Sequence, residues 1–164
     1  MLDKADLRGA NLTSVNLSGA SLIEADLRGA HMNGVILNRA NLTYACLTNA
    51  NVSYADLIKT DFTGATFENA EGIDGNFTGA NFEHASLIGV DFSFATLVNA
   101  DFTAAHLERI DFTDADLTDA TFKGATLVES VLVRTNLTGT DFTQHTSFEN
   151  VDLNTIKNLG EKRR

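Results

Sequence analysis

The side chains with the most reactive chemistry in this 164-residue sequence are those of four histidines and one cysteine. A protein metal site needs three or four ligands that converge on one point. His31, His84, His106 and His145 fall at different positions of the repeat that organises the sequence. Only His84 and His106 are spaced so that they approach each other, and no third ligand accompanies them. We therefore expect no metal site and no cofactor.

Covalent catalysis finds equally little support in the sequence. A nucleophile needs a base within hydrogen-bond reach and a pocket that excludes water. Cys46 is the sole cysteine, so it forms no internal disulfide, and it occupies a position expected to point outward. No glycine-rich phosphate loop follows a strand and opens a helix. The sequence predicts a protein that is not an enzyme and has no catalytic residues.

Acidic side chains are unevenly distributed along the chain. The formal net charge is −10, and residues 71–156 contain fourteen acids but only three bases. Four of the acids lie within ten residues, and a fifth lies twenty residues before the first of them: Asp111, Asp114, Asp116, Asp119 and Asp91. Such a surface repels phosphate backbones and attracts basic protein surfaces. The charge predicts no direct nucleic-acid binding, and the alternative is a solvated surface that serves solubility.

A five-residue period sets where these side chains lie. Every fifth residue from Leu2 to Phe142 is Leu, Phe, Met or Val at 28 of 29 positions, with Gly72 as the exception. Within each unit the first residue is small, the second is usually Asp, Asn, Ser or Thr, and the last two are mostly polar or Gly. A period of five fits neither a helix nor a simple strand, so each unit must turn. First and third residues are expected inside, and second and fourth outside.

Units such as Ala5-Asp-Leu-Arg-Gly, Ala25-Asp-Leu-Arg-Gly and Ala100-Asp-Phe-Thr-Ala resemble the A-(D/N)-L-X-X motif of pentapeptide-repeat proteins. The resemblance implies an all-β fold, a right-handed quadrilateral β-helix with four units per coil and about seven coils. It also implies a non-enzymatic protein-interaction scaffold, similar to the short bacterial, particularly cyanobacterial, members of the family. Some members mimic DNA and bind type II topoisomerases such as gyrase. This sequence has the acidic residues but lacks the loop insertions of those members, so DNA mimicry is the alternative function.

The single gap in the apolar period predicts a local irregularity. A persistent hole in place of a buried Leu or Val costs roughly 2–5 kcal/mol, so the space at Gly72 must be filled. Gly72 and Gly75 give the backbone freedom to rotate. We expect residues 71–75 to depart from their neighbours and Ile73 to turn inward.

Exposed apolar residues mark the expected interaction surface. Phe94 is the only Phe before residue 143 outside the apolar period, and Tyr54 lies forty residues before it. Ile58 and Val98 occupy the adjacent face at the same levels. These four residues predict a partner surface for an unidentified protein, the alternative being ordinary sheet filler.

The ends of the repeat give the predicted domain limits. After Gln144 the register slips by one residue, and a short cap follows in which Ile156 and Leu159 lie on the last coil. We expect a β-helix over residues 1–156 and a basic tail over 157–164. At the other end the repeat begins at once, so we expect an open edge and a weak homodimer through the N-terminal coil.

No apolar run is long enough to span a membrane, and no secretion signal is present at the start of the sequence. The expected location is the cytoplasm, unless a targeting segment was removed from this chain.

Overall fold

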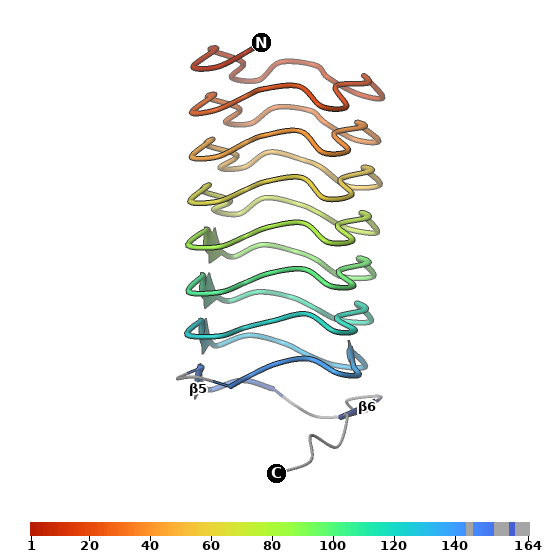
Figure 1. The fold of residues 1–164 in the computed structure, drawn as a ribbon, viewed down its shortest axis with the longest axis vertical. Coiled ribbons are helices and arrows are strands. Elements are labelled where there is room, and N and C mark those ends of the chain that lie inside the picture. Colours follow the sequence, from red (N-terminus) through yellow and green to blue (C-terminus); the bar gives the residue numbers. More distant parts are fainter. Residues whose placement is uncertain (144–145, 153–157, 160–164) are drawn as a thin grey trace.

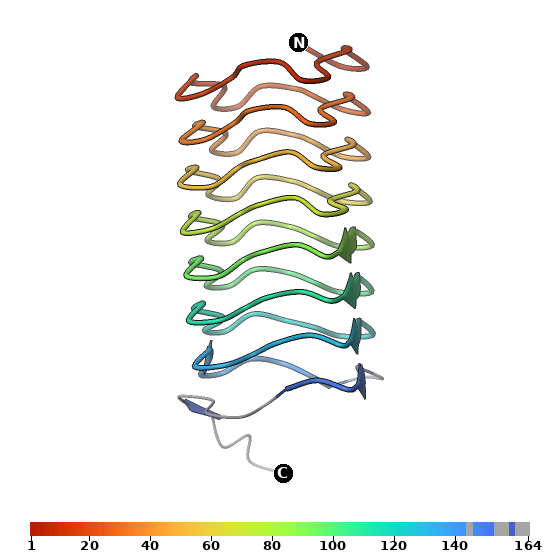
Figure 2. The same cartoon turned by 180° about the vertical axis from the view of Figure 1, so that it is seen from behind.

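The chain winds into a column of stacked coils, with the N-terminal residues at one end and β5 and β6 at the other (Figures 1 and 2). The structure is a computed structural model that describes residues 1–143, 146–152 and 158–159. Parallel backbone pairing joins residues twenty apart, from Asp6 with Asp26 to Thr121 with Asp141. Four five-residue units therefore make one coil. The fold is the expected right-handed, four-sided β-helix of about seven coils.

Most of this pairing consists of single-residue bridges, and six short strands stand out among the described residues. They are β1 (Ser86–Ile88), β2 (His106–Glu108), β3 (Thr126–Val128), β4 (Asn136–Leu137), β5 (Ser147–Glu149) and β6 (Asn158–Leu159). One parallel sheet has the order β1-β2-β3-β5, and β4 pairs in parallel with β6. Among the described residues, no helix is long and apolar enough to cross a membrane.

Each unit turns because its last residues form a tight bend. In a representative unit the amide of Ala105 donates to the carbonyl of Phe102 at 3.0 Å, and Ala104 has φ 55°. Positive φ at the third position of a hydrogen-bonded turn defines type II geometry. The carboxylate of Asp101 accepts the amide N–H of Thr103 at 2.8 Å, which holds the entry to the bend. Asp or Asn at the second position of a unit therefore stabilises the turn by accepting this hydrogen bond.

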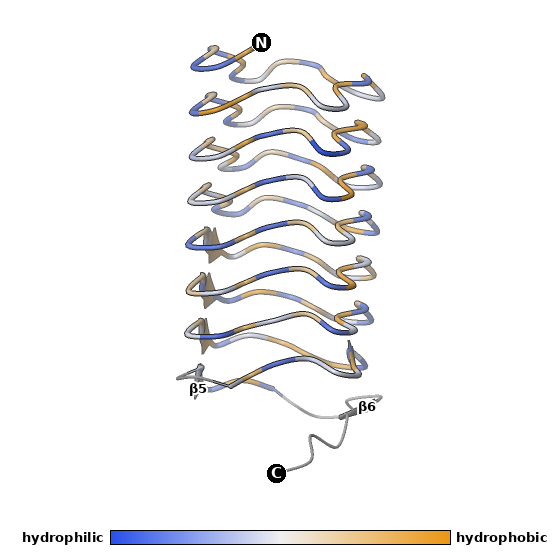
Figure 3. Cartoon of the chain, viewed as in Figure 1, coloured by the Kyte–Doolittle hydropathy of each residue, from blue (hydrophilic) through white to orange (hydrophobic). Residues whose placement is uncertain are grey.

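The interior is built from the first and third residues of each unit. From Leu22 to Leu132 these side chains are buried, and hydrophilic and hydrophobic residues alternate along every coil (Figure 3). Phenyl rings stack along one face at centroid distances of 5.0 Å for Phe82 with Phe102 and 4.7 Å for Phe102 with Phe122. Offset and stacked rings at these distances attract one another in addition to burying apolar area.

The expected irregularity at residues 71–75 is wrong in its mechanism. Glu71 pairs with Asp91 in the ordinary register, and Ile73 remains at an outer, half-buried position. Aromatic rings fill the space instead. A Cβ on Gly72 would lie 2.7 Å from the Cδ1 atom of Phe92, and one on Gly75 would lie 2.7 Å from the Cε2 atom of Phe77. Both glycines therefore make room for rings that enter from neighbouring positions.

The C-terminal coils contain the predicted register slip. Leu127 pairs with Phe148, which is an offset of 21, whereas Leu137 pairs with Leu159 at an offset of 22. The predicted boundary between residues 156 and 157, together with Ile156, lies outside the described residues and stays a prediction. In the first coil Leu2 and Leu7 pack only partly buried against the core.

Candidate interaction surface

The fifth residue of each unit lies at a corner of the column and points outward. Tyr54 and Phe94 both occupy this position with φ 61°, and their side chains are 66% and 57% exposed. The left-handed conformation costs a bulky residue roughly 1–2 kcal/mol, and an exposed ring gains little burial in return. The stability of the fold therefore does not explain why aromatic residues occupy these two positions.

Asp74 lies between these two rings on the same corner. Its φ is 55°, so its backbone repeats the geometry of Tyr54 and Phe94. The amides of Tyr54, Asp74 and Phe94 donate to carbonyls of the next coil at 2.9, 3.0 and 2.9 Å. Three outward side chains are thereby held in a row by a hydrogen-bonded backbone. Tyr54, Asp74 and Phe94 are named the aromatic corner below.

Ile58 and Val98 lie on the adjacent face at the levels of Tyr54 and Phe94. Both are half-buried, and Thr78 stands between them in the same column. The four residues predicted from the sequence are therefore interrupted by a polar residue on the face and by Asp74 at the corner. Their role in binding a partner stays a prediction.

The surroundings of the aromatic corner are acidic. Segments 51–58, 71–78 and 91–98, which make up the corner and its two adjacent faces over three coils, contain four acids and no Lys or Arg. Within these segments Glu71 accepts from Asn51, and Asp91 accepts the amide N–H of Ser93 at 2.9 Å.

Asp56 and Asp74 complete this set of four acids. Asp56 accepts from the amide group of Asn38 at 2.7 Å. Among the described residues, no side chain donates to the Asp74 carboxylate or pairs with it. Asp74 is thus the one carboxylate of the four that is both exposed and without a protein partner in the described part of the chain.

The five predicted acidic residues do not share one face. Asp91 and Asp111 are adjacent in the ladder, whereas Asp116 lies on the next face and Asp119 on the corner after it. Asp114 forms an ion pair with Arg134. The carboxylates of Asp111 and Asp116 accept amide N–H groups of their own turns at 2.8 and 3.0 Å. Much of the acidic character therefore serves the turns.

Sequence reasoning missed Tyr44, which is 65% exposed on the opposite corner. Its ring lies against Gly64, where an added Cβ would clash with the Cε1 atom of Tyr44. The signal was available, since Tyr44 is at the fifth position of its unit like Tyr54. In the next coil, the same corner holds Gly64 beside Tyr44 and Asp74 beside Tyr54.

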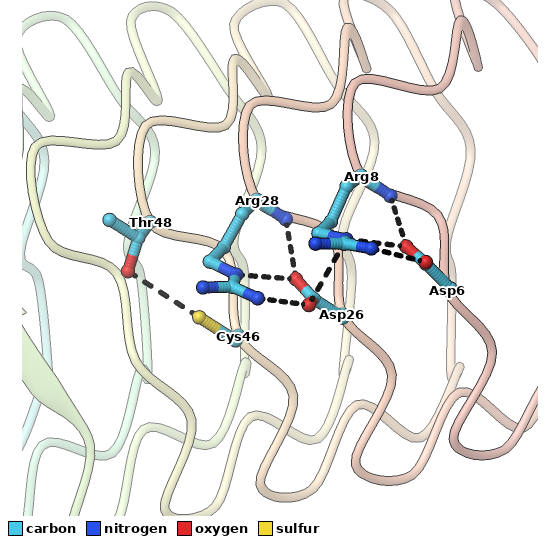
Figure 4. Close-up of polar contacts among 6 residues, drawn as sticks. All are labelled: Asp6, Arg8, Asp26, Arg28, Cys46 and Thr48. Atoms are coloured by element: carbon cyan, nitrogen blue, oxygen red, sulfur yellow. Dashed lines mark hydrogen bonds and ion pairs between the residues drawn. The ribbon is translucent and has the colours of Figure 1, made fainter.

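The first two coils carry a ladder of opposite charges on one face (Figure 4). The Arg8 guanidinium donates to both carboxylate oxygens of Asp6 at 2.8 and 2.7 Å, and lies 3.7 Å from Asp26 in the next coil. Arg28 binds Asp26 in the same way. The hydrogen bonds from Arg8 lower the pKa of Asp6 to about 2, and those from Arg28 lower the pKa of Asp26.

Cys46 continues this ladder in the third coil (Figure 4). Its Sγ atom lies 3.5 Å from the hydroxyl of Thr48, and the residue is half-buried. Among the described residues, Thr48 is the side chain that forms a hydrogen bond with this thiol.

The described histidines are separate from one another in their contacts. The Nε2 atom of His84 lies 3.5 Å from Glu83, and the Nδ1 atom of His106 lies 2.8 Å from the hydroxyl of Thr126. His31 is exposed, and His145 lies outside the described residues. No group of three His, Cys, Asp or Glu side chains in the described part of the chain could hold a metal ion.

A four-sided parallel β-helix that displays its outer side chains on stacked coils is a solenoid repeat protein. The sequence model described as pentapeptide repeats matches in eight copies, over residues 1–29, 20–53, 45–71, 76–114 and 115–154. The chain belongs to the pentapeptide repeat family.

Several solved structures are similar to this chain, and that of QnrB1 supports the fold. QnrB1, described as a plasmid-mediated fluoroquinolone resistance protein, is 21% identical over 90% of this chain and 73% of its own, with a TM-score of 0.77. HetL, involved in regulating heterocyst differentiation in the cyanobacterium Nostoc sp., is 23% identical over 90% and 86%, with a TM-score of 0.40. A pentapeptide repeat protein from the Arabidopsis thaliana thylakoid lumen is 28% identical over 68% and 66%, with a TM-score of 0.37. No curated protein sequence matches the chain.

Proposed function

We propose that this chain is a non-enzymatic scaffold that binds another protein through its outer surface. The observation that supports this most directly is the aromatic corner, where two rings are 66% and 57% exposed on a strained backbone. Tyr and Phe are enriched at protein interfaces, because a large ring contributes contact area at little cost in side-chain entropy.

The architecture suits this role. Backbone hydrogen bonds of 2.7–3.2 Å join each coil to the next, so the outer side chains are presented by a stiff framework. A binding surface that is already ordered loses little conformational entropy when its partner arrives.

Affinity capture from a native lysate tests the proposal. The double variant Tyr54→Ser plus Phe94→Ser is compared with the parent chain, and Tyr44→Ser serves as the matched control because Tyr44 has the same unit position and similar exposure. We expect at least one protein to be retained by the parent and by Tyr44→Ser but depleted by the double variant. Equal capture by all three chains counts against this surface, and no specific capture by the parent counts against the scaffold function.

Mimicry of DNA towards a type II topoisomerase is the alternative function. The supporting observation is the excess of acids over residues 71–156, which favours binding to a basic groove. Against it, Asp114 is paired with Arg134. A gyrase supercoiling assay tests this alternative, and unchanged supercoiling at tens of micromolar protein removes it.

Association of two copies through the N-terminal coil also stays a prediction. Leu2, Leu7, Leu12 and Leu17 are only partly buried there, and an open strand edge favours pairing. The interface would have the cross-section of one coil, so we expect a weak, concentration-dependent dimer. Light scattering that shows only monomer up to millimolar concentration contradicts it.

A further inference from the structure

We propose that the aromatic corner is a clamp for an arginine side chain of the partner protein, with the guanidinium between the rings of Tyr54 and Phe94 and paired with Asp74. This inference rests on the proposed scaffold function and specifies the chemistry that the partner must present. It commits to an exposed arginine on a flexible or protruding segment, because the corner is convex and is reached from outside.

The spacing of the two rings suits this guest. Tyr54 and Phe94 are forty residues apart and therefore two coils apart. At ~4.8 Å per coil, their backbones are separated by about 9.6 Å. A planar cation in contact with a ring on each side needs about 7–8 Å between the rings. Rotation of the two exposed side chains about their torsions closes that difference.

The charge of the corner selects a cation. Asp74 projects between the rings from an equivalent backbone position, and no described side chain neutralises it. The four acids and the absence of Lys and Arg from segments 51–58, 71–78 and 91–98 add a negative potential around it. A carboxylate beside aromatic faces favours a cation over a neutral side chain, since both the ion pair and the ring quadrupole attract positive charge.

Arginine fits better than lysine. The guanidinium is flat, so it stacks on both rings while its edge donates to a carboxylate, and it is more weakly hydrated than an ammonium. Tyr44, on the opposite corner, provides a comparison. It has a similar exposure, but Gly64 follows it on that corner, and Glu24, which precedes it, is paired with Lys4.

Titration with a blocked heptapeptide, acetyl-Gly-Ser-Gly-Arg-Gly-Ser-Gly-amide, followed by aromatic and amide NMR, tests the clamp. The matched probe replaces arginine with citrulline, which has nearly the same shape and no charge. We expect the arginine peptide to shift the ring signals of Tyr54 and Phe94 and the amide of Asp74, and to bind at least about threefold more tightly than the citrulline peptide. Equal binding of the two peptides overturns the inference.

Substitutions locate the binding. Asp74→Asn, Tyr54→Ser and Phe94→Ser should each weaken the arginine peptide by about threefold or more, because each removes one of the three contacts. Two controls should leave binding unchanged. Tyr44→Ser removes an equally exposed ring, and Asp119→Asn removes the same charge from another corner with φ 56°. Thermal melts of all five variants verify that the fold is retained. Equal weakening by Asp119→Asn and Asp74→Asn shows diffuse attraction to an acidic surface and overturns the clamp.

The lysate capture described above separates this inference from the function on which it rests. A partner that is retained equally by the parent and by Asp74→Asn supports the scaffold and overturns the clamp. Arginine-peptide binding at the corner without capture of any protein supports the clamp and counts against the scaffold.

Discussion

The glycine that interrupts the apolar pattern shows how far a single residue determines local packing. A gap at Gly72 suggests a cavity, yet the ring of Phe92 lies where the side chain would be. Phe77 and Phe92 contact each other edge to face, with centroids 5.0 Å apart. Gly72 thus leaves the space that the rings of Phe77 and Phe92 occupy.

Restoring an apolar side chain at this position should therefore destabilise the protein. A Cβ at residue 72 would lie 2.7 Å from Phe92, so Gly72→Ala forces the ring to move. Overpacking of this kind lowers the free energy of unfolding by about 1–3 kcal/mol. Urea denaturation measures the effect. The double variant Gly72→Ala plus Phe92→Leu should regain part of the loss, and a single variant as stable as the parent contradicts the packing described.

The Asp6–Arg8 pair gives a prediction that depends on pH. The pKa of Asp6 is lowered from 3.8 to about 2, so the folded state prefers the ionised carboxylate. Its contribution to stability is complete above about pH 4 and is lost as the pH falls towards 2. Carboxyl NMR titration should place the Asp6 pKa near 2 in the parent and closer to its ordinary value in Arg8→Gln. An unchanged Asp6 pKa in that variant would show that Arg8 is not the cause.

The site was only partly predictable at the residue scale. The outward position of Tyr54 and Phe94 followed from the five-residue period, because the fifth residue of a unit forms the corner between two faces. The role of Asp74 did not follow, since a carboxylate at a corner is common and only its partners distinguish it. Ile73 was misplaced because a period reports which direction a side chain points, and not which ring enters a gap from another coil.

At the scale of the element, the recurring unit is a turn that requires a left-handed residue. Ala104 has φ 55° and is exposed, whereas Ala105 is 2% exposed and belongs to the core. Of these two neighbouring alanines, Ala104 must adopt a left-handed backbone, whereas Ala105 must fill space in the core.

Glycine should consequently have opposite effects at these two positions. Ala104→Gly removes a strained Cβ and should raise the free energy of unfolding by about 0.5–1 kcal/mol. Ala105→Gly removes a buried methyl group and should lower it by about 1–2 kcal/mol. Thermal unfolding of both variants provides the comparison. Destabilisation by Ala104→Gly would argue against the turn geometry.

At the scale of the whole molecule, each coil is stabilised only by its neighbours and by one continuous core. Leu97 is fully buried in that core, and Val98 beside it is half-buried on the outside. A destabilising substitution in the core of one central coil therefore also destabilises the two coils that pack on it.

A buried charge provides the test. Leu97→Asp leaves an unpaired carboxylate in an apolar interior and should cost at least about 4 kcal/mol, enough to unfold much of the column. Val98→Asp adds the same charge one residue away and should change stability by much less. Circular dichroism and thermal melts distinguish the two. A Leu97→Asp variant that melts within a few degrees of the parent contradicts the inward assignment.

The fold could be predicted almost completely from the sequence. Period, burial and turn residues all agree over the first 142 residues. The five-residue period predicted which side chains face inward, and the resemblance to pentapeptide-repeat proteins supplied the four units per coil that give the offset of twenty. The slip was visible as the late spacing of Phe148, which pairs with Leu127. The second shift, which brings Leu159 beside Leu137, was not foreseen because the sequence there no longer repeats.

The offset of twenty residues per coil, which holds from Asp6 to Asp141, has a mechanical consequence. If the two ends of the column are pulled apart along its axis, the coils bear the load in series and each one peels from its neighbour. One released coil adds twenty extended residues and removes one coil rise, a gain of ~65 Å in length. Single-molecule force spectroscopy should therefore record successive increases in contour length of about this size. Each increase would correspond to the release of one coil.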